Sequence, residues 1–312
     1  MALRRALFGQ ADFGKACLER LIADGHKIAA VFAPPESARP DALATHAASL
    51  GLPLTRRRYF QKKDGTAIPA ALQDYRRLDA DLNVLASFTA FIPPAIAHAP
   101  KHKSIIFHPS LLPRFRGGAA LQWQIILGER ESGVSVFVPD EGVDAGPIVV
   151  QKGGVEIGPE DTTASLFFKK LSPLGVEAII EAVKQIDAGT ARLTRQDESQ
   201  ATFQGLVDDA IAAADLARPA VEVDRLVRGC DPQPGAFLRL HGEPVRLYDA
   251  RLEAGDAGRA GSVISIDDTG MRLALRGGIL RVGRVRGESG KEAAQEFCQR
   301  RGLHPGDRLE SG

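Results

Sequence analysis

Two titratable residues in this sequence stand where a short apolar run gives way to a turn. His108 follows the apolar run Ser104–Phe107, and the prolines after it cannot continue a central strand. Asp144 lies downstream in an acidic, glycine-spaced loop between the apolar runs 134–138 and 148–150. Ligands of open α/β sheets bind outside the carboxyl ends of the strands, so both side chains are placed for chemistry. We predict that His108 and Asp144 form one catalytic pair.

An imidazole beside a carboxylate can move protons during attack on a carbonyl carbon. A protonated His108 can donate a hydrogen bond to the oxyanion that forms in such a reaction. Asp144 can keep this imidazole charged and, directly or through a water, carry the proton from the nucleophile to the leaving group. Asp140 is the rival carboxylate in the same loop, and its position favours a capping or turn role.

The elements that position this pair alternate between strands and helices. A strand, a turn, a helix and a second strand are expected over Leu3–Phe8, 9–13, 14–23 and 28–33. Further buried strands are expected over 52–55, 82–86, 104–107, 134–138 and 148–151. Further helices are expected over 41–50, 68–78, 119–127 and 166–186, the last interrupted at Pro173. This order predicts an α/β fold with a doubly wound, mostly parallel sheet.

The chain changes character after residue 187. Polar residues, Gly, Thr and Gln dominate up to residue 206, and we interpret this stretch as a linker. A helix over 221–228 follows, and then short alternating segments at 238–240, 245–250, 262–266, 272–276 and 279–285. Glycine-rich turns separate these segments, which favours a small β-barrel. The predicted domains are a catalytic domain (residues 1–187), a linker (188–206) and a C-terminal barrel domain (207–312).

The composition is that of an ordinary globular chain. The 312 residues are 44% hydrophobic with a formal net charge of +1, so no global basic field demands a nucleic acid or an anionic membrane. Three widely spaced cysteines fit a reducing compartment better than a disulfide framework. No Cys/His cluster indicates a metal, and no apolar run reaches membrane-spanning length. We expect a cytoplasmic protein without a membrane segment.

Two motifs around the pair resemble those of a known family. HPSLLP (residues 108–113) and DxGxDxGPI (residues 140–148) resemble motifs of the formyltransferases that use 10-formyltetrahydrofolate. The first two-thirds of the chain look most similar to the hydrolase domain of 10-formyltetrahydrofolate dehydrogenase, whose hallmark is an isoleucine, here Ile106, in place of the usual asparagine. The PxPGAF turn (residues 232–237) and the segment 290–297 resemble the OB-like C-terminal domain of methionyl-tRNA formyltransferases.

This resemblance implies the Rossmann-like formyltransferase fold and a site for a folate co-substrate. It implies 10-formyltetrahydrofolate as the formyl donor and Asp144 as the catalytic acid. Neither a metal nor a nucleotide cofactor is expected, because the N-terminal glycines form neither a GxGxxG nor a GK[ST] motif. Aromatic residues after a core strand are otherwise more often packing residues. The residues expected to line the folate site are Phe88, Phe91, Ile92, Ser110, Leu111, Pro113, Val138, Asp140, Glu141 and Gly142.

Ile106 directs the functional hypothesis. Elsewhere in the family the asparagine is a second donor to the oxyanion, and losing one such donor costs on the order of 2–4 kcal/mol of transition-state stabilisation. Because isoleucine cannot donate, we expect a hydrolase-like enzyme that releases formate and tetrahydrofolate, unless a thiol or another acceptor takes the formyl group. No aldehyde dehydrogenase domain follows in this sequence, so we expect the complete dehydrogenase reaction to require another protein.

Three different functions stay open beside this hypothesis. Methionyl-tRNA formyltransferase activity is suggested by the two-domain length and the PxPGAF turn. Ile106, a near-neutral C-terminal domain and the lack of a basic insertion after residues 31–33 stand against it. A folate-binding protein with weak catalysis is the second function, and a sugar-nucleotide formyltransferase is the third. The favoured partner is therefore a small folate, and tRNA is a disfavoured one.

Overall fold

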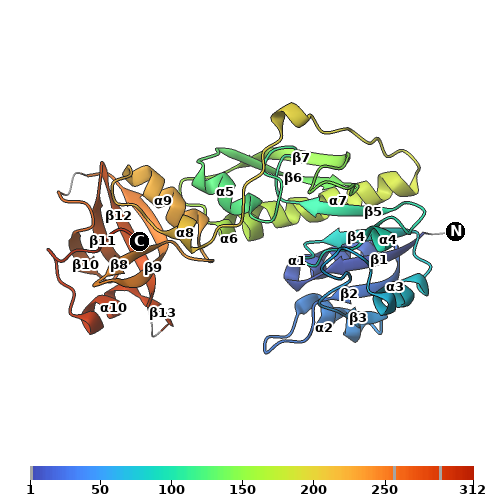
Figure 1. Cartoon of the computed structure of the whole chain (residues 1–312), viewed down its shortest axis with the longest axis horizontal. Coiled ribbons are helices and arrows are strands. Elements are labelled where there is room, and N and C mark those ends of the chain that lie inside the picture. The colour runs from blue at the N-terminus through green and yellow to red at the C-terminus, as the bar shows by residue number, and fades with distance from the viewer. Residues whose placement is uncertain (1–2, 256–257, 288–289) are drawn as a thin grey trace. The chain divides into compact units, whose positions relative to one another are not determined.

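Seven strands form the sheet of the first unit, in the order β3-β2-β1-β4-β5-β6-β7 (Figure 1). The computed structural model describes residues 3–255, 258–287 and 290–312. β1 to β5 pair in parallel, whereas β6 pairs with β5 in the antiparallel direction. The predicted doubly wound, mostly parallel sheet is therefore confirmed. Its strands are β1 (Arg4–Gly9), β2 (Lys27–Ala33), β3 (Leu54–Arg56), β4 (Leu82–Ala86), β5 (Ser104–His108), β6 (Glu131–Phe137) and β7 (Ile148–Glu156).

Helices connect these strands and continue into the C-terminal half of the chain. A π-helix covers Leu166–Leu171, and a short 3-10 helix covers Glu198–Gln200. The α-helices are α1 (Ala11–Ala23), α2 (Ala42–Ser49), α3 (Pro69–Arg76), α4 (Pro94–Ala97), α5 (Ala120–Ile126), α6 (Thr163–Ser165), α7 (Ser172–Asp187), α8 (Asp209–Ala212), α9 (Ala220–Gly229) and α10 (Ala294–Arg301).

Alternating side chains give the parallel part of the sheet two buried faces. On one face Phe8 of β1 stacks on Phe32 of β2, with ring centroids 4.3 Å apart, and α3 and α4 cover this aromatic layer. On the other face Phe107 of β5 contacts Phe13 of α1, with centroids 4.5 Å apart, and lies against Gly175 of α7. Strands covered on both sides must be apolar at nearly every position, which is the pattern that the sequence shows.

Contacts divide the chain into two units, each built from three segments. The first unit comprises the residues up to Arg116, Gly133–Gly154 and Leu171–Phe203; the second comprises Gly117–Ser132, Val155–Lys170 and the residues from Gln204 onward. Most of the stretch that we interpreted as a linker thus lies in the first unit. Thr194 forms a β-bridge with Ile148 at the start of β7, and Phe203 forms one with Arg116. Polar composition does not reveal such backbone pairing.

The second unit contains an antiparallel sheet in the order β10-β11-β12-β9-β8, with β13 paired to β12 (Figure 1). The predicted C-terminal β domain is confirmed in this form. Its longest strands extend beyond the expected segments, because β9 and β12 pair continuously from Ile279 and Glu253 to Arg286 and Arg246. The strands are β8 (Phe237–Leu240), β9 (Glu243–Glu253), β10 (Val263–Asp267), β11 (Gly270–Leu275), β12 (Gly278–Gly287) and β13 (Gly290–Ala293).

Two helix boundaries have identifiable physical reasons. α1 begins at Ala11, three residues before the expected start, and the Ala11 backbone N–H donates to Asp41 Oδ2 at 2.7 Å. Asp41 also caps α2 by accepting from the Ala44 N–H at 2.9 Å. The predicted break near Pro173 takes the form of a change of helix type, because the π-helix ends at Leu171 and Pro173 lies in the first turn of α7.

The structure also bears on thiols, metals and membranes. All three cysteines are buried with free thiols. In the described part of the chain, no group of three or more His, Cys, Asp or Glu side chains is arranged to hold a metal ion. Within the same ranges, no helix combines the length and the apolar character needed to cross a lipid bilayer.

Candidate active site

His108 is the last residue of β5, and its imidazole is buried. Antiparallel pairing places it opposite Ser135 of β6, and only 6% of the residue is exposed. Its Nε2 lies 2.7 Å from the carbonyl oxygen of Phe115. Because a carbonyl oxygen only accepts, Nε2 must carry a hydrogen. Nδ1 is therefore the ring nitrogen that faces the candidate site.

Asp144 approaches that nitrogen from the acidic loop. Its Oδ2 lies 3.6 Å from His108 Nδ1, and 20% of the side chain is exposed. This separation exceeds that of an ordinary hydrogen bond, about 2.7–3.2 Å, but is short enough for an ion pair when the imidazole is protonated. Asp144 has φ +51°, in the left-handed region that aspartate tolerates better than most residues. The structure thus brings the two predicted catalytic residues together.

A side chain from the predicted linker holds the acidic loop. Gln196 Nε2 donates to the carbonyl oxygens of Asp144 at 2.8 Å and Gly146 at 2.7 Å. Gln196 Oε1 accepts from Arg116, whose guanidinium also pairs with Glu198 at 2.6 Å. The bond to Glu198 raises the pKa of Arg116 above its ordinary value, which keeps this side chain charged. Because both ends of the Gln196 amide are bonded, its orientation is fixed.

Two glycines and an aspartate shape the same loop. A Cβ on Gly146 would lie 1.8 Å from the carbonyl oxygen of Val138, so only glycine fits there. Asp140 Oδ1 accepts a hydrogen bond from the Gly142 N–H at 2.9 Å, which is the geometry of a turn-forming aspartate. Of the two aspartates in the loop, Asp144 is therefore the one that approaches His108.

Polar side chains from β6 and β7 hold the turn that follows His108. Ser135 donates to the carbonyl oxygen of Ser110 at 2.7 Å and accepts from the Leu112 N–H at 3.1 Å. Gln151 donates to the carbonyl oxygen of Leu112 at 2.8 Å. The buried Ser110 hydroxyl donates to the carbonyl oxygen of Arg114 at 2.7 Å, so it serves the turn itself.

Ile106 lies two residues before His108 and therefore on the same face of β5. The side chain is partly buried and packs against a small cluster formed by Leu112, Phe137 and Ile148. Neither Ile106 nor these three neighbours carries a side-chain hydrogen-bond donor. The strand next to the imidazole thus presents an aliphatic surface.

The residues expected to line a folate differ in exposure. Phe91 is 77% exposed, whereas the Phe88 ring packs with its centroid 5.7 Å from those of Phe8 and Phe60. Phe88 thus belongs to the aromatic core, while Phe91 is open to contact. Of the other predicted residues, Val138 is buried, Asp140, Glu141 and Gly142 are exposed, and the partly buried ones are Ile92, Leu111 and Pro113.

Two cavities of the first unit border these loops. One has a volume of about 580 Å³ and is lined by residues 58–63 and 89–91. The other has a volume of about 570 Å³ and is lined by Asp140, Ala145, Pro147, Arg195, Gln196 and Glu198. Both volumes fall within the range of about 300–1,000 Å³ that is common for small-molecule sites.

Sequence reasoning missed the residues that support the pair. Gln196 acts through two backbone carbonyls, which leave no trace in a sequence, and its polar neighbours indicated a linker. Arg116 follows the HPSLLP turn closely, and this proximity was the one available signal for it. Ser135 alternates with apolar residues in a run that we treated as uniformly buried strand.

Two family matches cover most of the chain. Residues 3–183 match the formyl transferase family, and residues 210–302 match its C-terminal domain. The mitochondrial 10-formyltetrahydrofolate dehydrogenase of Mus musculus is 38% identical over 251 residues, which cover 80% of this chain and 27% of that protein. The chain thus spans about a quarter of the length of that dehydrogenase. The methionyl-tRNA formyltransferase of Dinoroseobacter shibae is 36% identical over 310 residues, 96% of this chain and 98% of that protein.

Solved structures share the fold. A crystal structure of HypX from Aquifex aeolicus in complex with tetrahydrofolic acid has a TM-score of 0.71 at 21% identity, covering 98% of this chain and 50% of that chain. Glycinamide ribonucleotide transformylase 1 from Symbiobacterium toebii has a TM-score of 0.53 at 21% identity, covering 63% of this chain and 95% of that chain. Both family matches and the full-length identity to a curated relative lead to one conclusion: the chain belongs to the formyl transferase family.

Proposed function

We propose that this protein removes the formyl group of 10-formyltetrahydrofolate, with water as the favoured acceptor and His108 and Asp144 as the catalytic pair. The observation that carries this proposal is the 3.6 Å approach of His108 Nδ1 to Asp144 Oδ2, on a strand whose neighbouring side chain is the aliphatic Ile106. Membership of the formyl transferase family and the identity to a 10-formyltetrahydrofolate dehydrogenase support the choice of substrate.

In this proposal His108 stabilises the oxyanion. Because Nε2 already donates to the Phe115 carbonyl oxygen, protonation of the ring adds its second hydrogen at Nδ1, on the side of Asp144. At 3.6 Å from Asp144 Oδ2, this hydrogen can be donated to the formyl oxygen as negative charge develops there. The bond to Phe115 orients the ring before the reaction, so little reorganisation is needed when the charge appears.

Asp144 moves the proton. Water attacks the formyl carbon and passes a proton to Asp144 as the tetrahedral intermediate forms. The bond between the formyl carbon and N10 then breaks, and Asp144 returns the proton to N10. Tetrahydrofolate and formic acid leave, the acid gives its proton to the solvent and becomes formate, and both residues regain their initial states. Because Ile106 has no hydrogen-bond donor, His108 is the one of these two residues that can stabilise the oxyanion.

The Asp144→Asn and His108→Ala variants should lower kcat for formate release on the order of 100- to 10,000-fold, because each removes a group that donates or moves a proton. Asparagine suits the left-handed backbone at position 144, so the loop should keep its shape. Asp140→Asn and His98→Ala, an exposed histidine, are the matched controls. An equal loss in Asp140→Asn and Asp144→Asn would contradict the pairing. Tight folate binding by the parent protein without formate release would favour a weakly catalytic folate-binding protein.

The Gln196→Ala variant should loosen the acidic loop, because it removes the hydrogen bonds to the carbonyl oxygens of Asp144 and Gly146. We expect kcat to fall about tenfold and the free energy of unfolding to fall by roughly 1–3 kcal/mol. Kinetics and urea unfolding measure the two effects. Gln200→Ala serves as the control, since Gln200 is exposed, lies four residues along the chain from Gln196, and its side chain donates to nearby Asp197, away from the carbonyl oxygens of the acidic loop. Unchanged kinetics in Gln196→Ala would show that the loop does not depend on this amide.

The Ile106→Asn variant should restore a donor beside the imidazole and raise kcat for formyl removal at least tenfold, since one such donor contributes on the order of 2–4 kcal/mol in other enzymes. It should also lower the free energy of unfolding by roughly 1–3 kcal/mol, because a polar amide enters an apolar cluster. Ile106→Val is the control that changes packing without adding a donor. If Ile106→Asn is no faster than Ile106→Val, position 106 does not face the oxyanion.

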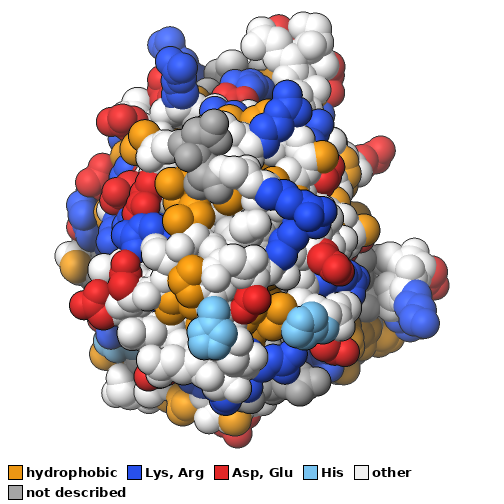
Figure 2. All heavy atoms as spheres, turned by 90° about the vertical axis from the view of Figure 1, so that its left-hand side faces the viewer, with side chains coloured by type: hydrophobic (Ala, Val, Ile, Leu, Met, Phe, Trp, Pro, Cys, Tyr) orange, Lys and Arg blue, Asp and Glu red, His pale blue; other side chains and the backbone are white. Residues whose placement is uncertain are grey.

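Methionyl-tRNA formyltransferase activity is the second candidate, because the identity to such an enzyme from Dinoroseobacter shibae extends over nearly its whole length. On the face shown in Figure 2, however, Lys and Arg side chains stand among acidic and apolar ones and form no continuous cationic surface.

We expect that the protein does not formylate aminoacylated initiator tRNA and does not bind this tRNA in a salt-dependent manner. Filter binding at several salt concentrations measures this. An affinity that falls about 10³- to 10⁵-fold between roughly 50 and 200 mM salt would favour the tRNA enzyme.

A further inference from the structure

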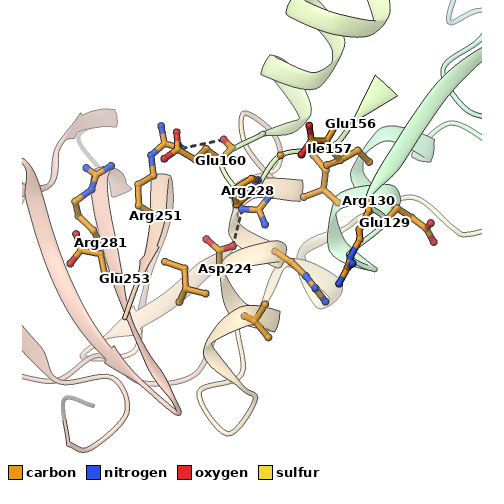
Figure 3. A pocket seen from close by; sticks show the side chains of 17 residues that line it. Glu129, Arg130, Glu156, Ile157, Glu160, Asp224, Arg228, Arg251, Glu253 and Arg281 are labelled. Atoms are coloured by element: carbon orange, nitrogen blue, oxygen red, sulfur yellow. Dashed lines mark hydrogen bonds and ion pairs between the residues drawn. The ribbon is translucent and has the colours of Figure 1, made fainter. Parts of the chain in front are cut away.

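A cavity of about 840 Å³ lies wholly within the second unit and shares no lining residue with the candidate active site. Its walls come from the end of α5, the segment after β7, helix α9 and strands β9 and β12 (Figure 3). Its size is within the range of known ligand sites. Arginine is the side chain that recurs most often around it, at positions 130, 225, 228, 251 and 281.

Three of these arginines are already engaged within the protein. Arg228 is buried and bonds to Asp224 Oδ2 at 2.8 Å and to the carbonyl oxygen of Asp161 at 2.8 Å. Arg251 pairs with Glu160 at 3.2 Å, and Figure 3 shows this contact and the one between Arg228 and Asp224 as dashed lines. Arg281 donates to the carbonyl oxygen of Thr269 at 2.7 Å. These side chains build the walls of the cavity.

Arg130 and Arg225 differ from the other three. Neither side chain makes an ion pair or a hydrogen bond with any residue in the described ranges. The guanidinium of Arg225 lies so close to Gly128 that a Cβ at that glycine would be 2.4 Å from the guanidinium carbon. Because Gly128 has no side chain, the Arg225 guanidinium can pack directly against its backbone at the cavity wall. Arg225 is partly buried and Arg130 is exposed, so both guanidinium groups can form charge-assisted hydrogen bonds to an anion in the cavity.

Asp224 presents a buried hydrogen-bond acceptor to the same cavity. The residue is only 3% exposed, and while its Oδ2 bonds to Arg228, its Oδ1 is buried with no hydrogen-bond partner. Burial raises the pKa of this carboxyl group in spite of the neighbouring arginines. A buried acceptor without a donor is costly and rare in folded proteins. Asp224 also lines the cavity, so a bound molecule can bring the missing N–H or O–H.

We propose that this cavity binds a small phosphorylated molecule, with its phosphate on Arg130 and Arg225 and a hydroxyl or amino hydrogen on Asp224 Oδ1. A phosphate monoester is close to a dianion at neutral pH, which matches two unpaired cations, and its oxygens suit the planar forks of two guanidinium groups. Acidic side chains, among them Glu129, Glu156 and Glu253, also line the cavity. They disfavour a long polyanion, so the ligand is a small molecule and not a nucleic acid.

Isothermal titration calorimetry with ribose 5-phosphate, inorganic phosphate and ribose tests this site. Ribose 5-phosphate carries both the phosphate and the hydroxyl donors, so we expect saturable binding at one site and weaker binding of inorganic phosphate. Ribose should give no binding. Arg225→Gln should weaken the binding of ribose 5-phosphate about tenfold or more, since it removes a charge-assisted hydrogen bond. Arg284→Gln changes an exposed arginine of β12 outside the cavity. It should change the dissociation constant of ribose 5-phosphate by no more than about twofold.

A second variant guards against a folding artefact. Gly128→Ala places a methyl group where the Arg225 guanidinium lies, so it should displace this guanidinium and weaken binding although both arginines are retained. Circular dichroism melting of each variant shows whether it is folded. The proposal is wrong if ribose 5-phosphate gives no saturable heat at millimolar concentration. It is equally wrong if Arg225→Gln and Arg284→Gln weaken the binding of ribose 5-phosphate to the same extent. It is also wrong if His108→Ala abolishes the binding, because the ligand would then occupy the candidate active site.

Discussion

Antiparallel pairing of β6 with β5 is the constraint on which the candidate site depends. It places His108, at the end of β5, opposite Ser135, and Ile106 opposite Phe137 at the end of β6. A parallel partner would need a long crossover and would end at the same edge of the sheet as β5. Because β6 runs the other way, the loop that carries Asp144 has to return toward His108 before Asp144 Oδ2 can lie 3.6 Å from its Nδ1.

Polar side chains then fix what the strands bring together. Ser135 and Gln151 bond to the backbone of the turn after His108, and Gln196 bonds to the backbone of the acidic loop. Each uses carbonyl or N–H groups that would otherwise lack a partner near the sheet edge. The backbone around the imidazole and the carboxylate is therefore held by residues that need not touch a substrate, as the proposed catalytic role of His108 and Asp144 requires.

Buried polar atoms without a hydrogen-bond partner occur in both units, among them Arg5 Nε, His26 Nε2 and Asp224 Oδ1. At Asp224 two further features are present. The residue lines a cavity, and Arg130 and Arg225 at the same cavity make no side-chain ion pair or hydrogen bond with a described residue. Unsatisfied buried polar groups are expensive, and a bound molecule can supply the missing partner. This combination is the physical basis for assigning a second ligand to the molecule.

The sequence by itself determined the fold class and the catalytic candidates, because near-continuous apolar runs, turn residues and the two motifs are local signals. It correctly predicted α/β order with a β-rich C-terminal domain, and it placed His108 at a strand end and Asp144 in a loop between strands. Only the tertiary structure decided that Gln196 holds the Asp144 loop, that Phe88 packs in the core while Phe91 is exposed, and that Asp224 lines a cavity with Arg225. These features rest on contacts between distant segments and on backbone carbonyls, and neither leaves a pattern along the chain.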